Sequence, residues 1–244
     1  MERINYSDFD KSRLDYYGNG FNSDYYLNER KEIFKIFKDK NIDVLDRREK
    51  VLDAYEKIDS DYISKATTKI MKNDVLIGYG SKFLDGDKMS TLIKKRGMLT
   101  ELKDIIELSK RIERIHNNEG NPVIGDINFD NIIVEGDNNP IFINQEDFGI
   151  NGIKPETISS ELYHYCTVKD YDMNISQDSD RLALLLAFFY KTFGRNVIQM
   201  REFMYNDYKF LYPYLEDCKE VYEDIISNHK EMPKVPYLHS ILKK

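Results

Sequence analysis

The hydrophobic pattern of the first third of the chain predicts a sheet with one helix. Short runs rich in β-branched and aromatic residues, bounded by polar turn residues, predict four strands. These runs occupy residues 25–27, 33–37, 63–71 and 75–83. Residues 44–57 instead repeat their apolar side chains at helical spacing. We therefore expect a small β-rich unit that contains a single helix.

The rest of the chain is predicted to be mainly helical, with one hairpin. Residues 99–116 carry apolar side chains at helical spacing, and residues 181–190 are apolar on nearly every face, which indicates a buried helix. Between them, β-branched runs at 132–134 and 141–143 flank a turn of Gly, Asn and Asp, which predicts a β-hairpin. Two or three further helices are expected after residue 195.

Two charged residues fall on faces that the pattern assigns to the interior. Lys35 shares a strand face with Ile33 and Phe37, because side chains alternate along a strand. Glu49 precedes Leu52 by three residues and belongs to the apolar stripe of its helix. A charge on a buried face requires a partner. We therefore expect Lys35 and Glu49 to form an ion pair.

Two alternatives stay open for these charges. Lys38 lies on the other face of the same strand, near its end, where a long side chain reaches solvent easily. Glu49 could equally lie at the edge of its stripe and reach solvent.

Composition narrows the class of protein. The 244 residues suit one domain of two parts, or two small domains. A net charge of −7, with no basic run interleaved with aromatic residues, argues against a nucleic-acid-binding protein. The polar, acidic start predicts no signal peptide, and the longest apolar run, 182–190, is too short to span a bilayer. Cys166 and Cys218 lie far apart, which suits a reducing compartment. We expect a soluble cytoplasmic protein.

The candidate chemistry lies around the predicted hairpin. Asp126 follows a short apolar run at 123–124, and Asn131 comes five residues later. The second hairpin strand then ends on Asn144. In phosphoryl transfer one group orients the nucleophile and others hold Mg²⁺ against the phosphates. The alternative is an ordinary hairpin with polar residues in its loops.

The pattern G-D-x-x-x-x-N, from Gly125 to Asn131, resembles the catalytic loop of the protein-kinase-like superfamily, in its atypical bacterial and small-molecule kinase branch. The resemblance implies an α+β fold of two lobes. A β-rich N-lobe with one helix would occupy residues 1–84, and a mostly helical C-lobe residues 85–244. Asp126 would be the catalytic base.

The resemblance extends through the predicted N-lobe. Gly18 and Gly20, with Ser23 in place of a third glycine, are similar to the glycine-rich loop that covers the phosphates of ATP. A plain hairpin turn is the alternative for this stretch. Lys35 would hold the α and β phosphates, and Glu49 would be its partner.

Further residues receive roles from position in the resemblance alone. Backbone groups of Lys82 and Leu84 would bind adenine, and Asp87 would reach the ribose. Ser81 would be a small residue beside the base. Asp180, before the apolar helix, would brace the backbone of the catalytic loop.

The second metal ligand departs from the family pattern. Asn131 is the expected first ligand of Mg²⁺ or Mn²⁺. The letters D-F-G occur at Asp147, Phe148 and Gly149, but the family's spacing places Asn144, thirteen positions after Asn131, at the second ligand. Asp147 or Glu146 could still reach the metal from the loop.

The function implied is an ATP-dependent phosphotransferase that moves the γ-phosphate to a hydroxyl on a protein or small molecule. The alternative is a pseudokinase that binds nucleotide or a partner without turnover, because Asn144 can ligate Mg²⁺ but brings no negative charge. Nucleotidyl transfer on the same fold is a third possibility.

Overall fold

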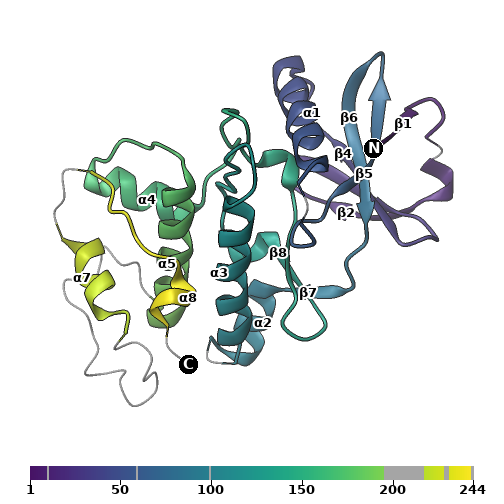
Figure 1. Cartoon of the computed structure of the whole chain (residues 1–244). Helices are drawn as coiled ribbons and strands as arrows, with labels where there is room; N and C mark the ends of the chain where they lie inside the picture. The colour runs from purple at the N-terminus through teal and green to yellow at the C-terminus, as the bar shows by residue number, and fades with distance from the viewer. Residues whose placement is uncertain (10, 59, 99, 195–216, 228–230, 243–244) are drawn as a thin grey trace.

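The computed structural model describes residues 1–9, 11–58, 60–98, 100–194, 217–227 and 231–242. It is a mixed α+β protein in which a six-stranded sheet forms at the N-terminal end and helices dominate the rest (Figure 1). A smaller, three-stranded sheet lies between these two parts (Figure 1).

The large sheet has the strand order β1-β5-β6-β4-β3-β2. Strand β1 runs parallel to β5, and the other neighbours are antiparallel. The bounds are Glu2–Asn5 for β1, Asp15–Asn19 for β2, Ser23–Leu27 for β3, Glu32–Phe37 for β4, Ala66–Lys72 for β5 and Val75–Lys82 for β6. The four predicted strands are confirmed. Strands β1 and β2 were not predicted, because their residues are polar or exposed and lack a regular alternation.

Helix α1 (Ile42–Glu56) covers one face of this sheet. Its Leu45 and Leu52 are buried against Phe37 of β4 and against residues of β5 and β6. Phe34 and Ile36 point to the opposite face, which N-terminal side chains cover. This alternation is the predicted one, and it directs Lys35 to the same side of the sheet as α1.

The small sheet connects the large sheet to the helices. It consists of β7 (Gly86–Lys88), β8 (Ile132–Glu135) and β9 (Pro140–Phe142), in that order. Strands β8 and β9 form the predicted hairpin, with Ile133 opposite Ile141. Only glycine fits at the start of β7, because a Cβ on Gly86 would lie 2.2 Å from the carbonyl oxygen of Val134.

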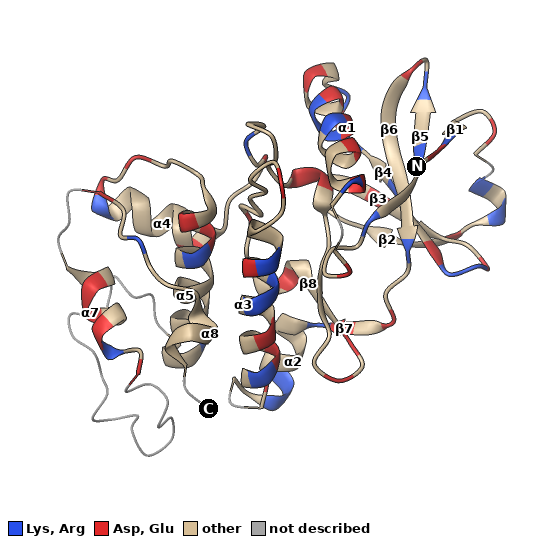
Figure 2. Cartoon of the chain, viewed as in Figure 1, with Lys and Arg blue, Asp and Glu red and all other residues tan. Residues whose placement is uncertain are grey.

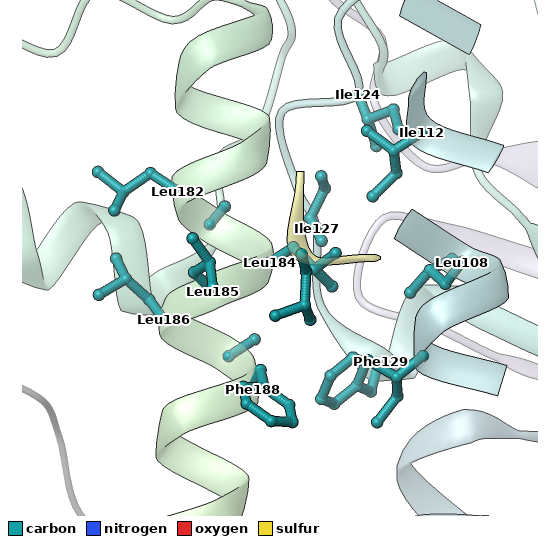
Figure 3. Close-up of a cluster of buried hydrophobic side chains, with 14 of the residues drawn as sticks. Leu108, Ile112, Ile124, Ile127, Phe129, Leu182, Leu184, Leu185, Leu186 and Phe188 are labelled. Atoms are coloured by element: carbon teal, nitrogen blue, oxygen red, sulfur yellow. The ribbon is translucent and has the colours of Figure 1, made fainter. Parts of the chain in front are cut away.

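The predicted long helix is α3 (Leu102–His116), and the predicted apolar helix is α5 (Gln177–Phe193). Their apolar faces meet around the loop 123–131 (Figure 3). Leu108 and Ile112 of α3 face Leu184 of α5, and Ile127 of the loop lies between the two helices. The loop that carries Asp126 therefore packs on a buried apolar cluster. The remaining described α-helices are α2 (Met89–Arg96), α4 (Ser160–Lys169), α7 (Lys219–Ile226) and α8 (Leu238–Ile241). Helices α7 and α8 agree with the expected C-terminal helices, whereas residues 195–216 lie outside the described part.

Charged residues of both signs are interspersed along α1 and α3, with no surface of one sign along either helix (Figure 2). Across the described ranges, no helix combines the length and the apolar character needed to cross a membrane.

Candidate functional site

A cavity of about 510 Å³ lies between the large sheet, the small sheet and α2. Eight of the residues singled out in the sequence line it. They are Gly18, Gly20, Lys35, Ser81, Lys82, Leu84, Asp87 and Asn144. Residues separated by more than 120 positions therefore line one partly open cavity.

The turn between β2 and β3 forms one rim of this cavity. The N–H of Gly20 donates to the carbonyl of Ser23 (2.8 Å), and Lys38 Nζ donates to the carbonyl of Gly20 (2.8 Å). A Cβ on Gly20 would lie 3.1 Å from the ring of Tyr25, so the turn approaches the strand closely. Ser23 itself is buried at the start of β3 and does not line the cavity. Lys38 is exposed and pairs with Asp24 (3.4 Å), so of the two lysines considered for this strand it is Lys35 that lines the cavity.

Lys35 is buried at the inner end of the cavity, and its partner is Glu146. Its Nζ donates to the Glu146 carboxylate and to Asn144 Oδ1 (3.0 Å), while the Tyr79 hydroxyl donates to Glu146 Oε2 (2.8 Å). Burial alone would lower the pKa of Lys35, but attraction to Glu146 raises it above its ordinary value. Burial opposes ionisation of Glu146 as well, yet Lys35 holds the pKa of that carboxyl below its ordinary value. Both groups are therefore charged at neutral pH.

The predicted ion pair between Lys35 and Glu49 is wrong. Glu49 instead accepts from Lys69 Nζ (2.8 Å) and from Arg3 (3.0 Å). Lys69 is a fully buried cation on β5 that also pairs with Asp53 (2.6 Å). The helical stripe located Glu49 correctly near the sheet, but the sequence does not indicate which of two buried lysines it meets.

Asp126, Asn131 and Asn144 form a continuous chain of hydrogen bonds that ends at Lys35. Asn131 Nδ2 donates to Asp126 Oδ2 (2.8 Å), and Asn144 Nδ2 donates to Asn131 Oδ1 (3.1 Å). Asn144 lies two residues after the end of β9 and adopts a left-handed conformation (φ 63°), and its side chain reaches Asn131 of the loop. The proximity of Asn144 and Asn131 that the thirteen-residue spacing predicted is confirmed.

Asn128 holds Asp126 from the other side. Its Nδ2 donates to Asp126 Oδ1 (2.8 Å), and its Oδ1 accepts from the backbone N–H of Asp130 and of Asn131. Both carboxylate oxygens of Asp126 therefore already accept one hydrogen bond. The sequence offered no separate signal for this role of Asn128.

Asp147 does not join this chain of hydrogen bonds. Its carboxylate lies 3.7 Å from Arg48 of α1. Burial, followed by repulsion from Glu146, raises the pKa of Asp147 to about 7. Of the two alternatives for the second ligand, only Asn144 contacts Asn131.

Two consecutive arginines of α1 hold the segment that follows β9. Arg47 donates to four backbone carbonyls, those of Glu146 (2.9 Å), Asp147 (3.2 Å), Phe148 (2.8 Å) and Lys154 (2.6 Å). Arg48 pairs with the carboxylate of Glu156 through two hydrogen bonds. Sequence reasoning missed both residues, although a pair of arginines beside an apolar stripe was a visible signal.

Asp180 contacts the loop backbone as predicted. Its carboxylate accepts from the N–H of Ile124 (2.7 Å) and of Gly125 (2.8 Å), and it lies 2.9 Å from His116 Nε2. Gly125 has φ 79°, and a Cβ there would lie 2.5 Å from Pro155. Both the backbone conformation and the limited space at Gly125, the residue before Asp126, therefore favour glycine.

The site therefore combines one carboxylate held by two amides, a buried lysine that lines a cavity, and a loop backbone hydrogen-bonded to Asp180. No protein-family model matches the chain, and no curated protein matches its sequence.

Proposed function

We propose that this chain is a two-lobed, kinase-like protein that binds ATP in the 510 Å³ cavity. The observation that carries the proposal is the hydrogen-bonded chain from Asp126 through Asn131 and Asn144 to Lys35. It links Asp126, which would orient an acceptor just outside the cavity, to Lys35, which lines the cavity and would bind phosphate.

The shape of the cavity supports one orientation of the nucleotide. Lys35, which contacts Asn144, lies opposite Tyr79, whereas residues 82–84 lie three or more positions further along at the end of β6, and they would receive the base. Ser81 is small and buried, so it leaves room there. The ammonium of Lys35 would receive the phosphates beside the turn at Gly18 and Gly20, because a lysine is a suitable donor to phosphate oxygens.

In the reaction we propose, Asp126 orients an acceptor hydroxyl toward the γ-phosphorus of ATP. The acceptor oxygen forms a bond to that phosphorus, the bond from the phosphorus to the β–γ bridging oxygen breaks, and ADP leaves. Asp126 takes the hydroxyl proton. The bonds from Asn128 and Asn131 fix the orientation of its carboxylate.

The described donors do not fit a divalent cation well. Mg²⁺ prefers carboxylate oxygens and phosphates. Asn131 and Asn144 supply neutral amides, and the oxygen of Asn144 already accepts from Lys35. Asp147 is turned toward Arg48. We therefore derive no step through a metal.

This donor set favours a second candidate function, nucleotide binding without turnover. A phosphoryl transfer develops charge that a metal ordinarily neutralises. With Asn144 in place of a carboxylate, that neutralisation is weaker, and the protein would act through the nucleotide-bound form itself.

Mass spectrometry of the purified protein after incubation with ATP and Mg²⁺ or Mn²⁺ tests these functions. Phosphotransferase activity predicts a phosphorylated chain or ADP formation that Asp126→Ala strongly reduces. Attachment of AMP would indicate nucleotidyl transfer instead. ATP binding measured by calorimetry, with no modified product and no ADP, would support the second candidate. The absence of both binding and product would overturn the proposal.

A further inference from the structure

The position expected to hold a metal already holds a cation of the chain itself. Lys35 Nζ lies 3.0 Å from Asn144 Oδ1 and in close contact with the Glu146 carboxylate. These two oxygens, one neutral and one negative, are the kind of ligand that a divalent cation would use, although two are too few to hold one. The ammonium binds both of them.

The neighbouring oxygens are also engaged. Asn131 Oδ1 accepts from Asn144, and the two oxygens of Asp126 accept from Asn128 and Asn131. A divalent cation would have to displace Lys35 from its buried partner or reverse the two amides. Each change breaks hydrogen bonds of buried or half-buried groups, which is costly.

Lys35 nevertheless retains capacity to bind an anion. An ammonium has three N–H donors, and Asn144 and Glu146 account for two of them. Lys35 lines the cavity, so its third donor is available to a phosphate oxygen there. Lys82 and Lys88 line the same cavity and add two positive charges, against one negative charge from Asp87.

We infer that the cavity binds the phosphates of ATP through Lys35 without a divalent cation. The inference rests on the proposed function, since it concerns how the same cavity binds its nucleotide. Asn144 is the residue that sets this property, because a carboxylate at the same position would attract a metal and compete for Lys35.

Calorimetric titration of the protein with ATP tests the inference, once with excess EDTA and once with excess Mg²⁺. The wild-type Kd is expected to agree between the two conditions within about threefold, which corresponds to less than ~1 kcal/mol. Asn144→Asp should bind ATP at least ~10-fold more tightly with Mg²⁺ than with EDTA, because its carboxylate adds a charged ligand. Asn73→Asp is the matched control, since Asn73 has a similar left-handed conformation (φ 51°) but lies in the exposed turn between β5 and β6.

Removal of the lysine identifies the binding group. Lys35→Met should lose ATP binding in both conditions. If that variant unfolds because Glu146 loses its partner, the double variant Lys35→Met with Glu146→Gln removes both charges and serves the same purpose. ATP binding by wild type that appears only with Mg²⁺ would overturn the inference and leave the proposed function intact. Binding that survives the loss of Lys35 would also overturn it. No ATP binding under either condition would overturn the proposed function together with the inference.

Discussion

The ammonium of Lys35 and the carboxylate of Glu146 form a buried ion pair between β4 and the loop after β9, 111 residues further along the chain. Tyr79 completes the shell of Glu146. This pair fixes the inner end of the cavity and joins the large sheet to the segment after the hairpin. Its contribution to the free energy of unfolding can be measured with variants.

Glu146→Gln should lower the free energy of unfolding by about 3 kcal/mol, because it leaves Lys35 as a buried charge without a charged partner. Urea unfolding at pH 7 measures this. Glu49→Gln is the control, since Lys69 keeps Asp53 as a partner (2.6 Å) and the loss should be below ~1.5 kcal/mol. Equal losses in the two variants would contradict the importance assigned to Glu146.

Asp126→Ala should reduce turnover by roughly 10²–10⁴-fold, the usual range for the loss of a general base. The Kd for ATP should change little, because Asp126 does not line the cavity. Initial rates of ADP formation and calorimetry give the two quantities. Asp130→Ala is the control, because Asp130 is exposed and contacts Ser90 (2.6 Å). Unchanged turnover in Asp126→Ala would place the chemistry elsewhere.

Asp180→Asn should destabilise the protein by roughly 2–3 kcal/mol, because an amide nitrogen cannot accept the backbone hydrogen bonds that the carboxylate accepts. It should also increase hydrogen exchange at Gly125. Asp178→Asn, in the same turn of α5, removes only a partly exposed pair with Arg181 and should have a small effect. Identical exchange rates in the two variants would argue against a bracing role.

The stability of the protein should depend on the ionisation of Asp104. Burial, then a hydrogen bond and repulsion from Glu101, raise the pKa of Asp104 from 3.8 to about 6, although Arg96 opposes this. Between these two pH values the folded protein holds a proton that the unfolded chain releases, so stability falls as the pH rises through that window. Asp104→Asn should escape this loss and gain up to about 3 kcal/mol over wild type above pH 6. Melting curves of wild type and variant from pH 3.5 to 8 give the difference in stability at each pH. That difference checks both the direction of the pH effect and the pH range over which it occurs.

Much of the fold could be predicted because its local patterns agree with its tertiary structure. The alternation of side chains correctly predicted the strand β4, and the apolar faces of α5 correctly predicted a buried helix. The strands β1 and β7 escaped prediction, since short exposed strands are stabilised by pairing with β5 and β8 rather than by a hydrophobic face.

Prediction of the site succeeded for residues whose proximity follows from their spacing along the chain. It failed where two residues of the same charge could each be the partner of a third. A hairpin of fixed length brought Asn144 to Asn131. The partner of Lys35 could not be chosen from sequence, because Glu49 and Glu146 are both acidic, and Arg47 and Arg48 of α1 hold the segment that carries Glu146 through contacts that no local pattern indicates. Their contacts are made with residues about a hundred positions away.

Those long-range contacts of Arg47 bear on the order in which the chain folds. They close loops of 99 to 107 residues. Closing such a loop costs chain entropy, so these contacts can form only after the two distant segments have come together. We expect them to form after the folding transition state. Arg47→Gln should then accelerate unfolding in stopped-flow measurements and leave the refolding rate nearly unchanged. A slower refolding rate would place Arg47 in the nucleus. If the unfolding rate alone changes, the hydrogen bonds of this one arginine determine the lifetime of the folded state and of the cavity that it contains.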